Sequence, residues 1–221
     1  MRNQYSSNTH KEMDSKLFTI EDFLSYQEKL QNSINTNNGE FFFNETMVHT
    51  DMVLNGIFQV AMLRNEEVKM FCGKFTGFRN EAKNIIDDFK RKAKPDETDV
   101  EKIDKWKSFL PYETLLETTK SFFDKGGKLT VILEKDLSEL SKDTPIWNII
   151  KEPLYSGQLS FYKLTVPVSL NHFTIAGTSF RRENSADART AICSFNSKET
   201  TDILDDSFHY LQKLSVPVNV A

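Results

Sequence analysis

A helix, two glycines and a buried-type strand follow one another in this chain, and this unit constrains the fold most. The helical part spans 112–125 and gathers large apolar side chains on one face, and Gly126 and Gly127 end it as a left-handed C-cap does. The strand, 128–133, is a nearly continuous apolar run, which suits a strand covered on both faces. The unit predicts a central strand in a helix-covered sheet. Its apolar residues are Leu115, Leu116, Phe122, Phe123, Leu129, Val131, Ile132 and Leu133.

Strand-like and helix-like segments alternate along most of the remaining chain. Such alternation is typical of α/β proteins, so we expect a mixed sheet flanked by helices on both faces, with the 67–72 strand in the same sheet as 128–133. The other expected strands are 41–43, 159–164, 172–176, 179–183 and 189–195, and the other expected helices are 51–64, 82–89, 146–154 and one that follows Asn196.

The first forty residues differ from the rest and predict an N-terminal helical arm. Residues 1–16 are polar and aperiodic, which is typical of a tail. A helix is expected to begin at Thr19, and an Asn-rich stretch, 32–39, then serves as a linker. We therefore divide the chain into a polar tail and helical arm, 1–40, and one α/β domain, 41–221, with the arm docked on the body or on a partner.

Charge and cysteine content exclude several classes of protein. The 28 Lys and Arg residues against 32 Asp and Glu residues give a net charge of -4, so the overall charge does not indicate nucleic acid binding, although a local basic patch would allow it. No signal-peptide core or apolar run of about 20 residues is present, so we expect a cytoplasmic protein without membrane association. Cys72 and Cys193 fall in predicted strands as buried thiols, and we expect no metal or cofactor.

Two predicted strands near the C-terminus contain the candidate catalytic residues. The first contains His172 and Thr174, and the second ends in Ser194 and Asn196, ahead of a helix. A histidine strand followed by a strand ending in Ser-x-Asn resembles the HxK, D, GSxN phosphodiesterase motif of the phospholipase D superfamily. Here Thr174 occupies the place of the lysine, Ser179 that of the aspartate and Cys193 that of the glycine, and some seven extra residues intervene.

The resemblance extends over about 45–212, since Ala61 to Met70, the strand 128–133 with its following acidic residue Glu134, and 159–164 occur in the family's order. It implies a phospholipase D-like fold and a metal-independent attack on phosphorus by His172, with Ser194 and Asn196 near the phosphoryl oxygens. The family needs two such histidines. With one per chain, the resemblance implies a homodimer.

The absence of the lysine bears on activity. Losing a cation aimed at the phosphoryl group removes about 3 kcal/mol of transition-state stabilisation or more. Arg181, Arg182 and Arg189 lie on or near adjacent predicted strands, where a guanidinium could supply the charge. The structural alternatives are a hydrogen-bonded His172, an Asn196 that caps the last helix, and a solvated hairpin at 181–183.

These observations favour a catalytically degenerate phospholipase D-like domain. It would act as a binding, regulatory or structural module, in the form of a homodimer and as one component of a multi-subunit bacterial system. Two alternatives remain: a divergent homodimeric phosphodiesterase or nuclease that uses His172, and a protein-interaction subunit that binds its partner through the N-terminal arm.

Overall fold

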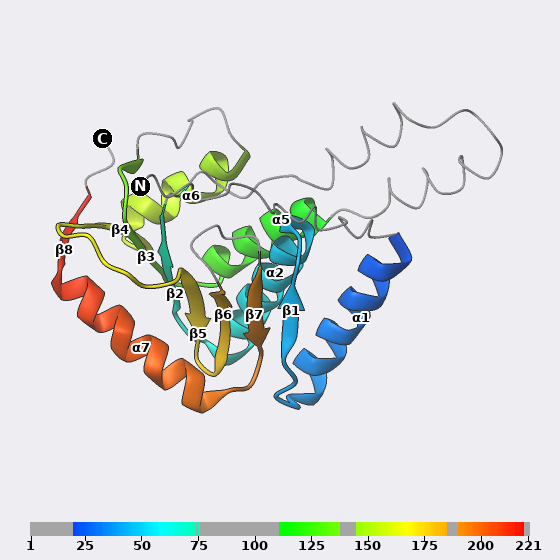
Figure 1. Cartoon of the computed structure of the whole chain (residues 1–221). Coiled ribbons are helices and arrows are strands. Elements are labelled where there is room, and N and C mark those ends of the chain that lie inside the picture. The colour runs from blue at the N-terminus through cyan, green and yellow to red at the C-terminus, as the bar shows by residue number, and fades with distance from the viewer. Residues whose placement is uncertain (1–19, 74, 76–110, 138–144, 185–189, 219–221) are drawn as a thin grey trace, which may run out of the picture.

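The alternating segments build one mixed sheet of eight strands in the order β1-β7-β6-β5-β2-β3-β4-β8, so the fold is α/β (Figure 1). The computed structural model describes residues 20–73, 75, 111–137, 145–184 and 190–218. The strands are β1 (Phe42–Asn44), β2 (Val68–Cys72), β3 (Leu129–Leu133), β4 (Leu159–Leu164), β5 (Phe173–Ala176), β6 (Ser179–Glu183), β7 (Ala191–Ser194) and β8 (Ser215–Pro217).

Three neighbouring strands, β2, β3 and β4, form a parallel part of the sheet, and all other pairings are antiparallel. Strand β3 pairs in parallel with β2 on one side and β4 on the other, and β2 then pairs with β5 in the antiparallel sense. Val131, Ile132 and Leu133 have no solvent exposure. The prediction that the 128–133 run forms an interior strand beside 67–72 is confirmed.

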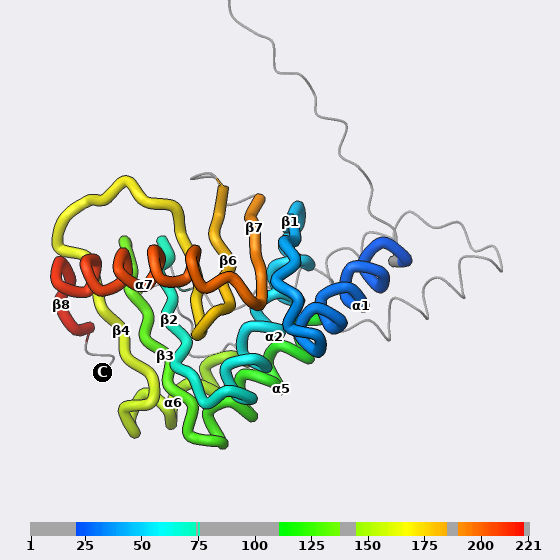
Figure 2. The backbone as a smooth tube through the Cα atoms, turned by 90° about the horizontal axis from the view of Figure 1, so that it is seen from below, coloured from blue at the N-terminus to red at the C-terminus, as the bar shows by residue number. Residues whose placement is uncertain are grey.

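Helices cover both faces of the sheet, as Figure 2 shows with α7 on one side and α2, α5 and α6 on the other. On the α7 side, Phe71 and Ile132 pack with Leu204, Phe208 and Leu211. Their strand neighbours point the other way and pack under the remaining helices, as the period of two in a strand requires. The helices are α1 (Ile20–Thr36), α2 (Met47–Arg64), α5 (Pro111–Asp124), α6 (Pro145–Ser156) and α7 (Lys198–Lys213).

The predicted helical arm packs on its own chain. Helix α1 lies against α2, and its Phe23 and Leu30 are 1% and 3% exposed within the main core. Tyr26 adds a hydrogen bond of 2.8 Å from its hydroxyl to Asn44 Oδ1 of β1. In the part of the chain that the structure describes, α1 is thus an integral layer of the α/β body, and the boundary placed at residue 40 crosses a shared core.

Several element boundaries differ from the sequence-based prediction. Helix α2 begins at Met47, earlier than predicted, because Thr46 caps it by accepting a hydrogen bond from the His49 amide at 3.2 Å. Strand β8 was not predicted. The predicted helix at 82–89, the charged segment 91–105, Thr19 and Arg189 lie outside the described residues. Among the described helices, none is both long and apolar enough to cross a bilayer.

Candidate functional site

His172 lies at the end of the sheet where the parallel strands finish. It directly precedes β5, which runs antiparallel to β2, so it meets Gly73 after β2 and Glu134 after β3. A side chain at Gly73 would approach His172 Cε1 to 3.1 Å, so the glycine leaves room for the ring. In α/β proteins this carboxyl edge is the usual place for ligands.

Both nitrogens of the His172 ring face carboxylates of the same chain. Nδ1 lies 2.9 Å from Glu183 Oε2, and Nε2 lies 3.2 Å from Glu134 Oε2. The Glu183 amide also donates to the His172 carbonyl at 2.9 Å, and the Phe71 ring meets the imidazole edge-on at 5.3 Å between centroids. The ring is therefore held by two strands, β6 and β2, and by the segment that follows β3.

A buried arginine extends this network. Arg181 Nη1 donates to Glu183 Oε1 at 3.1 Å, and Nη2 donates to Thr50 Oγ1 in α2 at 3.2 Å. Arg181 and Glu183 are only 6% and 8% exposed. Charges of alternating sign thus run from Glu134 through His172 and Glu183 to Arg181, and we call these four residues the charge chain.

Two residues of the charge chain, His172 and Glu183, have shifted pKa values. The hydrogen bond to Glu183, helped by the one to Glu134, raises the pKa of His172 against the opposing effect of burial. Burial alone would raise the pKa of Glu183, but hydrogen bonds and charges of His172 and Arg181 outweigh it and lower this pKa. These contacts therefore favour the charged form of the imidazole over the neutral form.

The contacts of both ring nitrogens limit what His172 can do chemically. A nucleophilic histidine needs an unprotonated ring nitrogen facing the phosphorus, with the other nitrogen oriented by a hydrogen bond. Here Glu183 provides the orienting bond, but Glu134 occupies the nitrogen that would attack. The arrangement suits salt bridges from His172 to Glu183 and Glu134 better than it suits a nucleophilic histidine.

Thr174, at the lysine position of the resemblance, lies inside the sheet. It is 3% exposed in the middle of β5, where it pairs with Met70 of β2 and with Arg181 of β6. Arg181 is thus brought next to both Thr174 and His172, but its guanidinium is bound to Glu183 and Thr50. The threonine itself is buried between the two strands.

The other two arginines are not brought to His172 in the described residues. Arg182 pairs with Phe173 and Ile192, and its exposed side chain belongs to the opposite face of β6 from Arg181. Arg189 lies outside the described residues. The hairpin cluster at 181–183 is therefore split, with Arg181 and Glu183 buried and Arg182 in solvent.

Ser194 and Asn196 lie at the far end of the sheet from His172. Ser194 is fully buried and pairs with Phe180, which places it about 14 Å from His172, counting three residues along a strand and two strand spacings. Asn196 Nδ2 donates to the Asn37 carbonyl at 2.9 Å. The structure does not bring these two residues to the histidine.

The predicted capping role of Asn196 is wrong in detail. Helix α7 begins at Lys198, and Ser197 occupies its N-cap position. The Asn196 side chain instead forms a hydrogen bond with the segment after α1. Ser179, at the aspartate position, is buried and donates from Oγ to the Phe195 carbonyl at 3.0 Å. Both residues thus serve the packing of the chain.

Sequence reasoning missed the roles of Glu134, Glu183 and Thr50. Glu134 was noted only as the acidic residue after a buried strand, and Glu183 only as a member of the hairpin cluster. If Gly177 and Thr178 form a two-residue turn, the hairpin places Glu183 opposite His172. The contact between these two residues could therefore have been predicted from the sequence. Nothing in the local sequence pairs Thr50 with Arg181.

The two cysteines are free thiols. Burial, together with the charges of Glu183 and Glu134, raises the pKa of Cys72 to about 12. Burial also raises the pKa of Cys193 to about 12, and its thiol donates to Asn44 Oδ1 at 3.6 Å. Neither thiol is disposed to ionise. Within the described ranges, no group of three or more His, Cys, Asp and Glu residues is placed to hold a metal ion.

Comparison with known proteins gives little support for any assignment. No protein-family model matches the chain, and no curated protein matches it. One solved structure is similar at a TM-score of 0.48 and 13% identity: TrmBL2, described as an archaeal chromatin protein with a novel mode of DNA binding. The match covers 90% of this chain and 65% of that one, just under two thirds of its length. This likeness is too low to assign a fold or a function.

Proposed function

We propose that this chain is a phospholipase D-like α/β module that has lost catalysis and acts by binding, as a homodimeric regulatory or structural component of a larger bacterial assembly. The observation that carries the proposal is the position of His172 between Glu183 and Glu134, 2.9 and 3.2 Å away. Since both ring nitrogens are engaged and the pKa is raised, the imidazole has little capacity to attack phosphorus.

The surroundings of the histidine support the same conclusion. The family's lysine is replaced by the buried Thr174, and Arg181, its neighbour across the strands, is already bound to Glu183. The two acids and two bases of the charge chain compensate one another, so no excess positive charge is left for a phosphate. A binding function of this module is therefore expected elsewhere on its surface.

A divergent phosphodiesterase remains the second candidate because of one contact. The bond between Glu183 and His172 Nδ1 is the orienting interaction that a nucleophilic histidine uses, and the contact of Nε2 with Glu134 is the longer of the two. Movement of Glu134, which is about a third exposed in its side chain, would free Nε2.

Turnover of a generic phosphodiester in metal-free buffer separates the two candidates. We expect no difference between wild type and His172→Ala, and no activity for Glu134→Gln, in which Nε2 loses its carboxylate. Turnover by wild type or by Glu134→Gln that His172→Ala abolishes would identify the histidine as a nucleophile and overturn the degenerate assignment. Glu199→Gln, an acidic-to-amide change on α7, is the matched control.

A further inference from the structure

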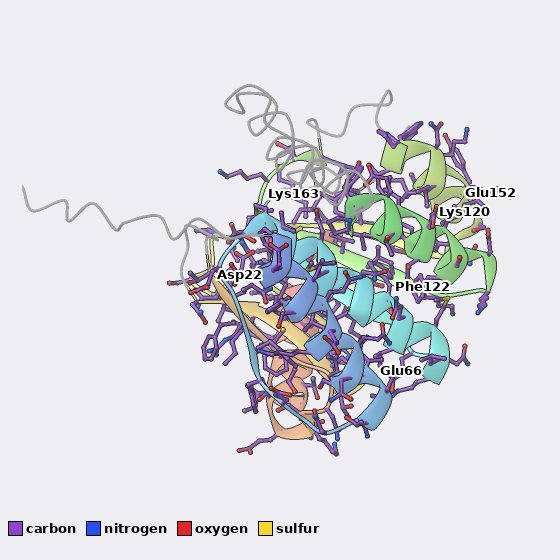
Figure 3. The ribbon with its side chains drawn as sticks, turned by 90° about the vertical axis from the view of Figure 1, so that its right-hand side faces the viewer. Asp22, Glu66, Lys120, Phe122, Glu152 and Lys163 are labelled. Atoms are coloured by element: carbon purple, nitrogen blue, oxygen red, sulfur yellow. The ribbon has the colours of Figure 1, made fainter. Side chains whose placement is uncertain are left out.

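Strand β1 forms one edge of the sheet. It pairs with β7 through Phe42 and Cys193, and no described strand pairs with its other side. Figure 3, which faces this side of the molecule, shows α1 and α2 stacked next to the edge. An edge strand presents unpaired backbone donors and acceptors, and most proteins protect such an edge or use it to bind another strand.

The residues of β1 alternate between a buried and an exposed face. Phe42 is 5% exposed and points into the core under the helices. Phe41 and Phe43, on either side, point to the opposite face and are 49% and 63% exposed. Helix α7 packs on β4, β5, β6 and β8, and Figure 2 shows β1 and β7 beyond its end. Two aromatic rings thus stand on a part of the sheet that no helix among the described residues covers.

Charges of both signs surround these rings. Phe43 pairs with Ile192 of β7, which pairs with the exposed Arg182 of β6, so the three side chains form one row on the uncovered face. The exposed acids Glu40 and Glu45 flank β1. Aromatic and arginine side chains are enriched at interfaces. A copy of β1 paired antiparallel about Phe42 would set Glu40 opposite Asn44 and Glu45 opposite Gly39, so that no like charges face each other.

We propose that β1 and its exposed aromatic face are the homodimer interface, with the β1 strands of two copies paired antiparallel about a two-fold axis at Phe42. This inference rests on the homodimer of the proposed function. Phe41 of each copy then lies opposite Phe43 of the other, and all four rings share one face. A shift by one residue would reverse the faces and set Glu40 against Glu45, which is unfavourable.

This dimer keeps the two histidines apart. His172 adjoins β5, three strand spacings from β1, so the two copies of His172 are separated by seven strand spacings, or roughly 34 Å. An active family pair would need them to meet at one phosphate. The interface therefore joins two sheets into one of sixteen strands without completing a catalytic site.

Light scattering on the full chain tests the interface. We expect wild type to have twice the 25.6 kDa mass of the chain, and Phe41→Ser with Phe43→Ser to be monomeric at the same micromolar concentration. Leu63→Ser, at an apolar residue that is 78% exposed on α2, is the matched control and should remain dimeric. A dimeric double variant would overturn the interface but not the homodimer. A monomeric wild type would overturn both, and the phosphodiester assay would still test the loss of catalysis separately.

Disulfide cross-linking tests the register. Opposite Cα atoms of antiparallel strands lie 4.5–5.5 Å apart, within the range that a disulfide spans. A mixture of Phe41→Cys and Phe43→Cys chains should form a covalent dimer on mild oxidation, whereas Phe41→Cys alone should not. Wild type controls for Cys72 and Cys193. Equal cross-linking by Phe41→Cys alone, or none in the mixture, would overturn the register centred on Phe42.

Discussion

Arg181 stands directly opposite Thr174 in the antiparallel pairing of β5 and β6. Thr174 occupies the place of the lysine in the resemblance to the phospholipase D superfamily, so a cation is present on the neighbouring strand. The Arg181 guanidinium is almost fully buried and donates hydrogen bonds to Glu183 and Thr50, so it interacts with its own chain. The positive charge at this position therefore stabilises the charge chain.

Replacement of this arginine should be costly. Arg181→Met would leave Glu183, 8% exposed, without its main cationic neighbour on β6. Removing one partner of a buried ion pair costs about 3 kcal/mol or more. Denaturant unfolding should show that loss, whereas Arg182→Met, on the solvent side of the same strand, should change the free energy of unfolding by less than about 0.5 kcal/mol. Equal losses of stability in the two variants would contradict the buried ion pair between Arg181 and Glu183.

A lysine at position 174, where the resemblance places one, should not produce diester turnover. Thr174→Lys would place an ammonium group at a site that is 3% exposed and faces Arg181 across the strands. Burial of an unpaired charge beside a like charge predicts a loss of about 3 kcal/mol in stability and no diester turnover. Thr174→Val is the control for the loss of the hydroxyl. A stable and active Thr174→Lys protein would mean that the site is more open than described.

The charge chain predicts a characteristic pH dependence. The pKa of His172 is raised above 6.5, so its stabilisation is fully present below pH 6.5 and is lost as the pH rises through the folded-state pKa. The pKa of Glu183 is lowered below 4.5, so its contribution is present above pH 4.5 and is lost as the pH falls through its folded-state pKa. Together they predict greatest stability from these groups between about pH 4.5 and 6.5.

Unfolding by urea across pH 5 to 9 measures the histidine part of this dependence. Wild type should lose free energy of unfolding above pH 6.5 relative to His172→Gln, which keeps hydrogen-bonding capacity without a titrating ring. His209→Gln, an exposed histidine on α7, should follow wild type. If the stability of wild type and of His172→Gln depended on pH in the same way, His172 would have the same pKa in the folded and unfolded states, contrary to this prediction.

Gly56 tests the packing of α2 on the segment after β7. Alanine at an open helical position gains about 1 kcal/mol over glycine. At Gly56 the added Cβ would lie 2.6 Å from Phe195 Cζ, a ring with no solvent exposure, so we expect Gly56→Ala to destabilise by about 1–3 kcal/mol instead. Gly56→Ala should reduce stability less in a Phe195→Leu background. Thermal melts of wild type, the two single variants and the double variant would measure this difference. A stabilising Gly56→Ala would contradict this packing.

Local sequence patterns predicted most of the secondary structure because apolar periodicity is a local property. The run at 128–133 is buried on both faces, and it forms an interior strand. Strand β8 was missed because three residues containing Pro217 carry no strand signal, and its pairing with β4 is a tertiary effect.

The candidate site was only partly predictable because strand direction is not encoded in motif order. His172 begins its strand, and Ser194 ends one. Strands β5 and β7 both run antiparallel to β6 and are therefore parallel to each other, so the start of one and the end of the other lie at opposite ends of the sheet. Glu134 comes near His172 because β2 pairs with both β3 and β5, and these pairings cannot be read from spacing in the sequence.

The most direct test of the central claim, that His172 is an ionic connection and no nucleophile, is a nitrogen-15 NMR titration of the histidine ring with His172→Gln for assignment. We expect a pKa above 6.5 for His172, lowered by Glu134→Gln, because both carboxylates hold the charged ring. A pKa at or below 6.5 with an unprotonated Nε2 at neutral pH would contradict it, since that nitrogen would then be free to attack phosphorus.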